Sequence, residues 1–350
     1  MPIERIKLTP DYSVSRIIKG GWHLAGGHGK INRDIAIDDM KKFVMAGITT
    51  FDCADIYTGV EELIGEFMVK YRDQFHSGEL PEVQIHTKYV PDLNTLKDIT
   101  LKDTEKIIDR SLSRLNVERL DLVQFHWWDY SVPRYIEVAN HLKDLKEKGK
   151  IRYIGLTNFD GKRVREIAKS GVPIISNQVQ YSLLDHRVED DLNSKMKKFN
   201  IQYLCYGVLA GGFLTNSYLN QKEPVPPFEN RSLTKYRLII DEYGGYSLYQ
   251  KALSAINLIA NKHNVGIAEI AMKYILQKKY VASIIIGSRD SKHLSNLDRL
   301  DNFELDNSDL ELLRQINKSG LGPSGRFYAL EREKEGKHAS IMKYNLNSEK

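Results

Sequence analysis

The chain has 350 residues, of which 41% are hydrophobic, and its 51 Lys and Arg residues exceed its 46 Asp and Glu residues by five. This composition excludes disorder, collagen and coiled coil, and it supplies enough apolar material for one large barrel core or two ordinary domains. A net charge of +5, with basic residues alternating with acidic ones along the surface helices, argues against a nucleic-acid partner.

The sequence carries no signal for a membrane, a secretory route or a metal centre. No apolar run approaches the roughly 18 residues that a membrane span requires, and Glu4, Arg5 and Lys7 stand where a secretory signal would be apolar. The two cysteines, Cys53 and Cys205, are too few for a disulfide framework or a thiolate zinc site. We therefore expect a cytoplasmic protein with no bound metal, and nothing in the sequence indicates its oligomeric state.

Short runs rich in β-branched and aromatic residues recur eight times, which is typical of buried parallel strands. These runs span residues 15–22, 48–55, 83–89, 121–128, 151–158, 174–181, 201–209 and 282–289. Between them the apolar residues change to helical spacing, and Gly47, Gly149 and Gly171 follow the last apolar residue of three such stretches, where glycine commonly ends a helix.

Eight alternations of strand and helix leave two α/β architectures, a closed (β/α)8 TIM barrel or an open doubly wound sheet. The count favours the barrel. A doubly wound dinucleotide-binding fold would carry G-x-G-x-x-G after its first strand, and the glycines at positions 20, 21, 26, 27 and 29 do not fit that spacing.

Three segments lie outside the repeat. Residues 6–16 are expected to form a hairpin that plugs the bottom of the barrel, and the chain after Gly322 is a polar tail. The long loop after strand 7, residues 215–245, contains Pro and Gly and shows no clear periodicity, so we predict a functional lid there. The whole chain, 1–350, is predicted to be one domain with a barrel core at about 15–318 and a tail at 319–350.

Barrel active sites form at the carboxyl ends of the strands, where this sequence places Asp52, Tyr57, Lys88 and His126. These types form a coherent set for proton transfer to a carbonyl. A free tyrosine has a pKa near 10, whereas a general acid works best at neutral pH when its pKa is near 7. The difference of about three units corresponds to ~4 kcal/mol. Lys88, held by Asp52, would lower the pKa of Tyr57 by favouring the phenolate, and neutral His126 would donate to the carbonyl oxygen and aim it at Tyr57.

Seven segments resemble the aldo-keto reductase family. FDCADIYTGVEELIGEF (51–67) resembles the signature around the catalytic Asp and Tyr of that family, HTKY (86–89) its lysine strand, and QFHWWD (124–129) its His-Trp strand. The segments similar to further parts of the family, in the same order, are GKIRYIGLTNF (149–159), NQVQYS (177–182), CYGVLAGG (205–212) and IIIGSRDSKHL (284–294). The resemblance covers most of the chain, from about Gly20 to Leu300.

By that resemblance the protein is an enzyme, a TIM barrel that binds NADP(H) without a Rossmann domain and reduces an aldehyde or ketone, or oxidises an alcohol or sugar in reverse. Tyr57 would be the proton donor, Lys88 and Asp52 its tuning pair, and His126 the orienting residue. The cofactor-binding residues that the resemblance implies are Thr157, Asn158 and Gln178 on the carboxamide, Tyr206 stacked on the nicotinamide, and Leu209, Gly287, Ser288, Arg289 and His293.

Aromatic residues at strand tips commonly line a substrate pocket, so Trp22, Tyr89 and Trp127 are expected to surround a small carbonyl or alcohol substrate. Arg289 and Lys292 offer cations to a 2′-phosphate, whereas Asp290 offers an acceptor to a ribose hydroxyl. The sequence therefore favours NADPH and leaves NADH open.

The residues at the strand ends are also compatible with two other functional hypotheses. A cofactor-binding regulatory subunit with slow turnover, resembling potassium channel β-subunits, would have the same fold. A metal-dependent barrel hydrolase would use His86, His126 and the aspartates, but GGWH (20–23) lacks the H-x-H pair that such a site needs. Taken singly, the Lys88 and Asp52 pair is as often structural as catalytic, and His86 is more often a core histidine than a ligand.

Overall fold

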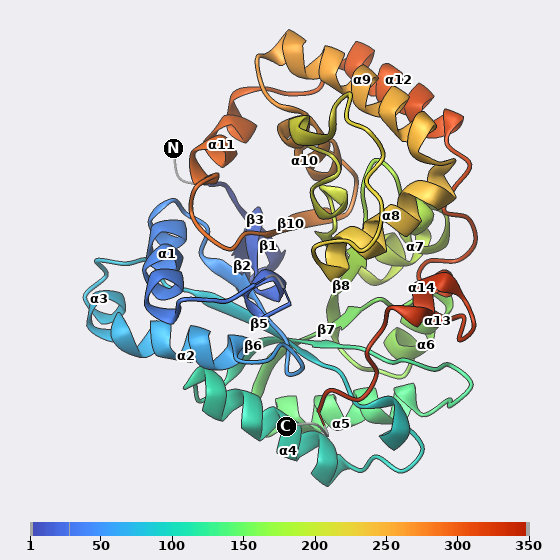
Figure 1. Cartoon of the computed structure of the whole chain (residues 1–350). Helices are drawn as coiled ribbons and strands as arrows, with labels where there is room; N and C mark the ends of the chain where they lie inside the picture. The colour runs from blue at the N-terminus through green and yellow to red at the C-terminus, as the bar shows by residue number, and fades with distance from the viewer. Residues whose placement is uncertain (1–2, 28, 348–350) are drawn as a thin grey trace.

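Eight parallel strands close into a barrel in the computed structural model of the chain, which describes residues 3–27 and 29–347 (Figure 1). The strands pair in the order β10-β3-β4-β5-β6-β7-β8-β9, and β9 pairs with β10 to complete the ring. Their bounds are β3 Ile17–Gly20, β4 Thr50–Asp52, β5 Gln84–Tyr89, β6 Leu120–Phe125, β7 Ile151–Thr157, β8 Ile174–Gln180, β9 Gln202–Tyr206 and β10 Val281–Gly287. The predicted TIM barrel is confirmed.

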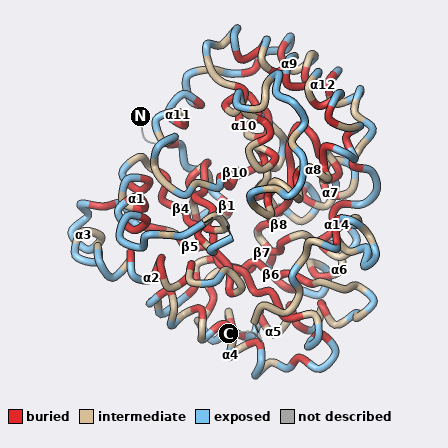
Figure 2. Tube along the Cα trace, in the orientation of Figure 1, coloured by how far each residue is buried: buried red, intermediate tan, exposed pale blue. Residues whose placement is uncertain are grey.

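Helices surround this barrel and bury their apolar faces against it, so that burial is densest on the strands (Figure 2). Their bounds are α1 Arg33–Met45, α2 Val60–Lys70, α3 Arg72–His76, α4 Leu101–Leu115, α5 Tyr135–Glu147, α6 Gly161–Lys169, α7 Arg187–Phe199, α8 Arg231–Tyr243, α9 Tyr246–His263, α10 Ile267–Leu276, α11 Leu294–Leu297, α12 Asn307–Ser319, α13 Ala329–Arg332 and α14 Lys337–Ser340. Gly47, Gly149 and Gly171 follow α1, α5 and α6 with positive φ, as predicted for helix stops. No helix within the described residues is long and apolar enough to cross a membrane.

Side chains along each barrel strand alternate between the barrel interior and the surrounding helices. In β5, His86 contacts Tyr12 inside the barrel and Lys88 contacts Asp52 of β4. Tyr89 points the other way, and its hydroxyl lies 3.0 Å from Thr104 of α4. Only every second residue of a strand is therefore available to a site inside the barrel mouth.

The N-terminal hairpin closes the opposite end of the barrel. Its strands, β1 (Arg5–Thr9) and β2 (Tyr12–Ser15), pair antiparallel. The hairpin packs into a separate apolar cluster with inward residues of the barrel strands, namely Leu8, Tyr12, Val14, Ile18, Leu122, Leu204, Ala282 and Ile285. Tyr12 also hydrogen-bonds Nε2 of His86 at 3.0 Å, so the predicted plug and the core role of His86 are both confirmed.

Two segments differ from the sequence prediction. Residues 215–245, predicted as an irregular lid, contain the 13-residue helix α8, whose buried Tyr236, Ile239, Ile240 and Tyr243 have helical spacing. The segment after Gly322, predicted as a polar tail, contains α13 and α14 and runs back over the barrel (Figure 1). Both segments bring side chains to the mouth of the barrel.

Candidate active site

A cavity of about 370 Å³ lies at the carboxyl ends of the strands. Every barrel strand contributes to its wall with a residue at its carboxyl end or close to it. These residues are Gly20, Asp52, Lys88, His126, Thr157, Gln178, Tyr206 and Gly287. The barrel thus brings together polar groups that are far apart in the sequence.

Asp52 and Lys88 form a buried ion pair at the floor of this cavity. Lys88 Nζ lies 2.5 Å from Asp52 Oδ2 and donates to the Cys53 carbonyl at 2.8 Å. The other carboxylate oxygen, Oδ1, accepts from the side-chain amides of Gln124 at 2.8 Å and Gln178 at 2.6 Å. Burial alone would lower the pKa of Lys88, but the Asp52 carboxylate outweighs it and raises that pKa above its usual value. The ammonium is therefore charged at any ordinary pH.

Tyr57 stands above this pair, on the turn that joins β4 to α2. Lys88 Nζ lies 4.9 Å from the centre of the Tyr57 ring. The centres of the Trp22 and Tyr57 rings are 5.0 Å apart. The sequence predicted a lowered pKa for Tyr57, but the direction is the opposite. Burial raises the pKa of the phenol above 10, because it outweighs the opposing effect of Lys88, whose charge Asp52 balances. The phenol therefore keeps its proton at neutral pH.

His126 follows β6 and is buried between the end of β7 and aromatic rings. Its Nδ1 lies 3.1 Å from the Thr157 carbonyl, and its ring meets Trp128 edge-on at 4.3 Å. Burial lowers the pKa of His126 to about 3, so the ring is neutral. A carbonyl only accepts, so Nδ1 carries the proton and Nε2, which has no partner among the described residues, is an acceptor. The sequence predicted a donor to the carbonyl oxygen, and this tautomer reverses that role.

The residues assigned to the carboxamide and the nicotinamide ring meet on one side of the cavity. The Tyr206 hydroxyl donates to Asn158 Oδ1 at 2.9 Å. Gln178 donates both amide hydrogens, to Asp52 and to Gln124 Oε1 at 2.7 Å, so its own oxygen is the atom left to accept from a ligand. The Tyr206 ring lines the cavity and is half-buried, with Lys235 Nζ 4.9 Å from its centre. Together with an amide nitrogen and an amide oxygen, this ring fits a planar ligand ring that carries a carboxamide.

The chain resembles known proteins in sequence and in fold. The family model "Aldo/keto reductase family" matches residues 16–318. The chain belongs to the aldo/keto reductase family. It is 26% identical over 342 residues to a probable aldo-keto reductase 1 of Glycine max, covering 93% of this chain and 92% of that protein. It is 25% identical to an NADH-specific methylglyoxal reductase of Escherichia coli, covering 88% and 96%. A solved glycerol dehydrogenase structure from Gluconobacter oxydans shares the fold, with a TM-score of 0.75, 24% identity, and 92% and 97% of the two chains covered.

In this aldo/keto reductase the residues assigned to the nucleotide's phosphates lie on a loop that follows β10. Gly287 lines the cavity, whereas Ser288, Arg289 and His293 lie beyond its wall. The Ser288 carbonyl accepts from buried Lys19 at 3.0 Å, and Arg289 Nη2 donates to the Lys30 carbonyl at 3.3 Å. His293 is exposed just before α11. Leu209, on the loop after β9, does line the cavity.

Two of the three predicted pocket aromatics do not reach the cavity of this aldo/keto reductase. Tyr89 and Trp127 are fully buried on the helix side of their strands, where Tyr89 binds Thr104 and the Trp127 indole donates to the carbonyls of Asp129 and Val132. Strand parity explains both, because Lys88 and His126 take the inward positions. Trp22 lines the cavity as predicted, and Trp128 does so in place of Trp127.

Sequence reasoning missed several residues that complete the site. Gln124, two positions before His126, orients the Asp52 carboxylate. The lining also includes side chains from α8 and from the C-terminal segment, among them Arg231, Lys235, Tyr328, Ile341 and Met342. Asp55, on the turn after β4, is buried and accepts from the Val90 backbone at 3.1 Å. Within the described residues, no three His, Cys, Asp or Glu side chains cluster as metal ligands would.

Proposed function

We propose that this protein reduces an aldehyde or ketone with a nicotinamide nucleotide and that Tyr57 donates the proton. The observation that carries the proposal is the buried Asp52 and Lys88 pair, whose ammonium lies 4.9 Å from the ring of a protonated tyrosine in the cavity wall. A structural ion pair has no need of a tyrosine, a neutral histidine and an open cavity beside it. Membership of the aldo/keto reductase family supports the same reaction.

When bound, the reduced nucleotide supplies a hydride to the carbonyl carbon. Tyr57 gives its hydroxyl proton to the carbonyl oxygen, so that the C=O bond becomes an alcohol and the residue is left as a phenolate. Lys88 stabilises this phenolate electrostatically, and Asp52 holds the ammonium in place. Tyr57 then regains a proton from water.

His126 binds the substrate oxygen after Tyr57 has protonated that oxygen. Its Nε2 lone pair faces the cavity and accepts a hydrogen bond from the O–H of the alcohol or from a hydroxyl beside the carbonyl. In the reverse direction the alcohol turns its O–H from His126 Nε2 to the Tyr57 phenolate, which takes the proton. This role suits a neutral ring, and burial keeps the pKa of His126 at about 3.

Asn158 and Gln178 would hold the carboxamide, and Tyr206 would lie against the nicotinamide ring. As the nucleotide we favour NADPH, because one carbonyl contact at 3.3 Å is the only hydrogen bond of the Arg289 guanidinium within the described residues. Lys292 is a weaker candidate, since its ammonium already lies 3.1 Å from Asp290. The Escherichia coli relative named for NADH keeps that nucleotide as the alternative.

The test is oxidation of NADPH and NADH, followed at 340 nm, with a panel of small aldehydes and ketones. The Tyr57→Phe variant keeps the ring that lies beside Lys88 and Trp22 but has no proton to give. It should lose roughly 10²–10⁴-fold in kcat, the usual contribution of a general acid, while its nucleotide affinity stays within a few-fold. Retention of the wild-type kcat would exclude Tyr57 as the donor. Nucleotide binding with negligible turnover of every carbonyl would favour the regulatory-subunit reading instead.

A further inference from the structure

The C-terminal segment, residues 326–347, forms one wall of the active-site cavity. Tyr328, Ile341 and Met342 line it, and the Tyr328 ring lies 6.0 Å from the His126 ring on centroids. Farther along, Asn347 donates to the Val90 carbonyl at 2.8 Å and to Asp55 Oδ2 at 3.1 Å. The segment therefore crosses the barrel mouth and is held on its far side.

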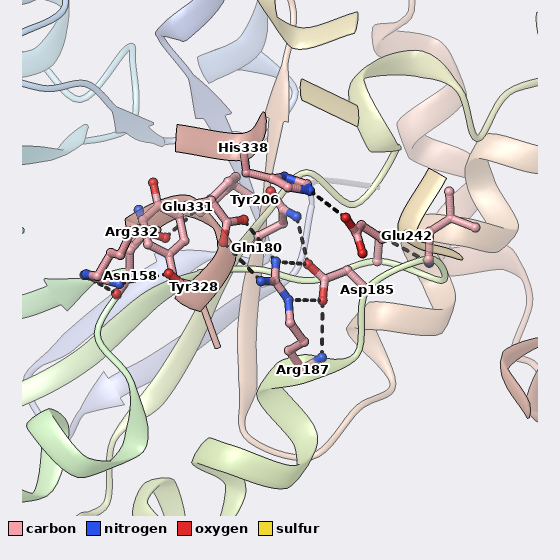
Figure 3. Close-up of polar contacts among 12 residues, drawn as sticks. Asn158, Gln180, Asp185, Arg187, Tyr206, Glu242, Tyr328, Glu331, Arg332 and His338 are labelled. Atoms are coloured by element: carbon pink, nitrogen blue, oxygen red, sulfur yellow. Dashed lines mark hydrogen bonds and ion pairs between the residues drawn. The ribbon is translucent and has the colours of Figure 1, made fainter. Parts of the chain in front are cut away.

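A buried ion-pair network anchors this segment to the barrel (Figure 3). Arg187, at the start of α7, binds both oxygens of Glu331 at 3.0 Å and also contacts Asp185 at 2.8 Å. The side chains of Arg187 and Glu331 are 1% and 0% exposed, so water does not screen the pair. This contact fixes α13 in position, but it does not touch a residue assigned to the nucleotide.

The next residue, Arg332, makes a different contact. Its Nη2 donates to the backbone carbonyl of Asn158 at 2.8 Å (Figure 3). The same atom donates to the Trp127 carbonyl at 2.9 Å. Asn158 has φ of 62°, a left-handed conformation that asparagine adopts more readily than other non-glycine residues. The Asn158 side chain in turn accepts from Tyr206 at 2.9 Å. Arg332 thus supports the backbone of the carboxamide residue without lining the cavity itself.

We propose that Arg332 is a positioning residue that couples closure of the C-terminal segment to nucleotide binding, by holding Asn158 in the geometry that receives the carboxamide. The proposal deepens the proposed function and rests on it. Coupling between two sites is reciprocal. If closure of the segment raises the nucleotide affinity by some factor, nucleotide binding must raise the equilibrium constant for closure by the same factor.

The structure offers a matched control for this guanidinium. Arg163 and Arg332 both stack on the Tyr130 ring, at 4.3 and 4.2 Å from its centre. Arg163 donates to the Asp160 side chain at 2.9 Å, however, and has no contact with the Asn158 carbonyl. Replacing either residue by Met removes one stacked cation from the Tyr130 ring. The Arg332 variant also releases the Asn158 and Trp127 carbonyls and loses the stacking of Arg332 on the Tyr328 ring at 4.8 Å, a contact that Arg332→Lys tests separately from the loss of a donor.

The experiment measures NADPH and NADH affinity by fluorescence titration for wild type, Arg332→Met, Arg332→Lys and Arg163→Met, with hydrogen exchange of residues 326–347 with and without nucleotide. We expect Arg332→Met to weaken both nucleotides by about 10-fold or more, within the usual range of coupling between sites, and to abolish the nucleotide-induced protection of the segment. Arg332→Lys should recover part of the affinity, because an ammonium still donates to a carbonyl, and Arg163→Met should stay within about 2-fold.

Equal effects of Arg332→Met and Arg163→Met would overturn the proposal, and so would a wild-type segment whose exchange the nucleotide leaves unchanged. The second readout needs no variant, so an unchanged segment overturns the proposal even where Arg332→Met fails to fold, and Arg332→Lys then tests the role of the guanidinium. A wild-type protein that binds neither nucleotide would overturn the proposed function, and this proposal with it.

Discussion

The two ends of the predicted nucleotide site are built differently. The carboxamide end, formed by Asn158, Gln178 and Tyr206, is tied to itself and to Asp52 by hydrogen bonds of 2.6–2.9 Å between side chains. The phosphate end, formed by Ser288, Arg289 and His293, lies on a loop where Arg289 makes a single hydrogen bond to the described part of the chain, 3.3 Å to a backbone carbonyl. The first end is preorganised for chemistry. At the second, Lys19 holds the Ser288 backbone, and the Arg289 side chain is held by fewer contacts than the side chains of the first end. Substitutions at the first should therefore cost far more than substitutions at the second.

The strongest way to break the preorganised end is Lys88→Met, which leaves the Asp52 carboxylate buried without its cation. We expect carbonyl reduction to be lost and the free energy of unfolding to fall by about 3–5 kcal/mol, the usual cost of breaking a buried pair. Chemical denaturation and steady-state kinetics measure the two effects. The double variant Asp52→Asn/Lys88→Met should regain much of the stability and none of the activity. A single variant as stable as wild type would contradict the burial argument.

Gly207 follows Tyr206 at the carboxamide end, and Gly212 lies farther along the same loop. The φ of Gly207 is 72°, and a Cβ there would lie 2.1 Å from the Tyr236 hydroxyl. Gly212 has φ of 106° and open space around its Cβ position, so Gly212→Ala carries the backbone strain alone, about 1–3 kcal/mol. Gly207→Ala should be less stable than Gly212→Ala and should bind nucleotide more weakly, because the Tyr236 side chain, which lines the cavity, must shift. Equal unfolding free energies and affinities of the two variants would show that the loop absorbs the clash.

The smallest effect is expected at the phosphate end. Arg289→Ala should weaken NADPH binding by roughly 1.5–3 kcal/mol, the range for a charge-assisted hydrogen bond, and hardly change NADH. Lys292→Ala should cost less, because that side chain is 80% exposed and paired with Asp290. Fluorescence titration of both nucleotides measures these differences. Equal losses for NADPH and NADH in the Arg289 variant would place the residue on the shared diphosphate or in a loop-supporting role, and would favour NADH.

The barrel and the Asp52, Tyr57, Lys88 and His126 set were predictable because parallel strands in a closed barrel bring their carboxyl ends together whatever their separation in sequence. Residue type and position after a strand were then enough. The helical spacing of Tyr236, Ile239, Ile240 and Tyr243 is obscured by the Pro and Gly residues before it, so α8 is not predicted from the sequence.

The remaining features depend on contacts that leave no local pattern. Glu331 belongs to a run of charged residues typical of a solvated tail, yet its partner Arg187 lies 144 positions earlier. The direction in which the pKa of Tyr57 shifts depends on burial. The ring nitrogen of His126 that carries the proton depends on the Thr157 carbonyl. Residue type reveals neither. Trp127 was preferred to Trp128 because strand alternation is hard to follow where β6 ends, at Phe125.

The seam between β3 and β10 has a consequence for how the chain reaches this fold. Ile17 pairs with Ile284, and Arg16 donates to the Val281 carbonyl across a separation of 265 positions. Such a contact forms only after most of the chain has been gathered, so ring closure is expected to come late and to be slow. Until then β3 and β10 are two open sheet edges, each able to pair with another chain. Refolding yield should therefore fall as protein concentration rises, and variants that weaken the Arg16 contacts should show the steepest fall.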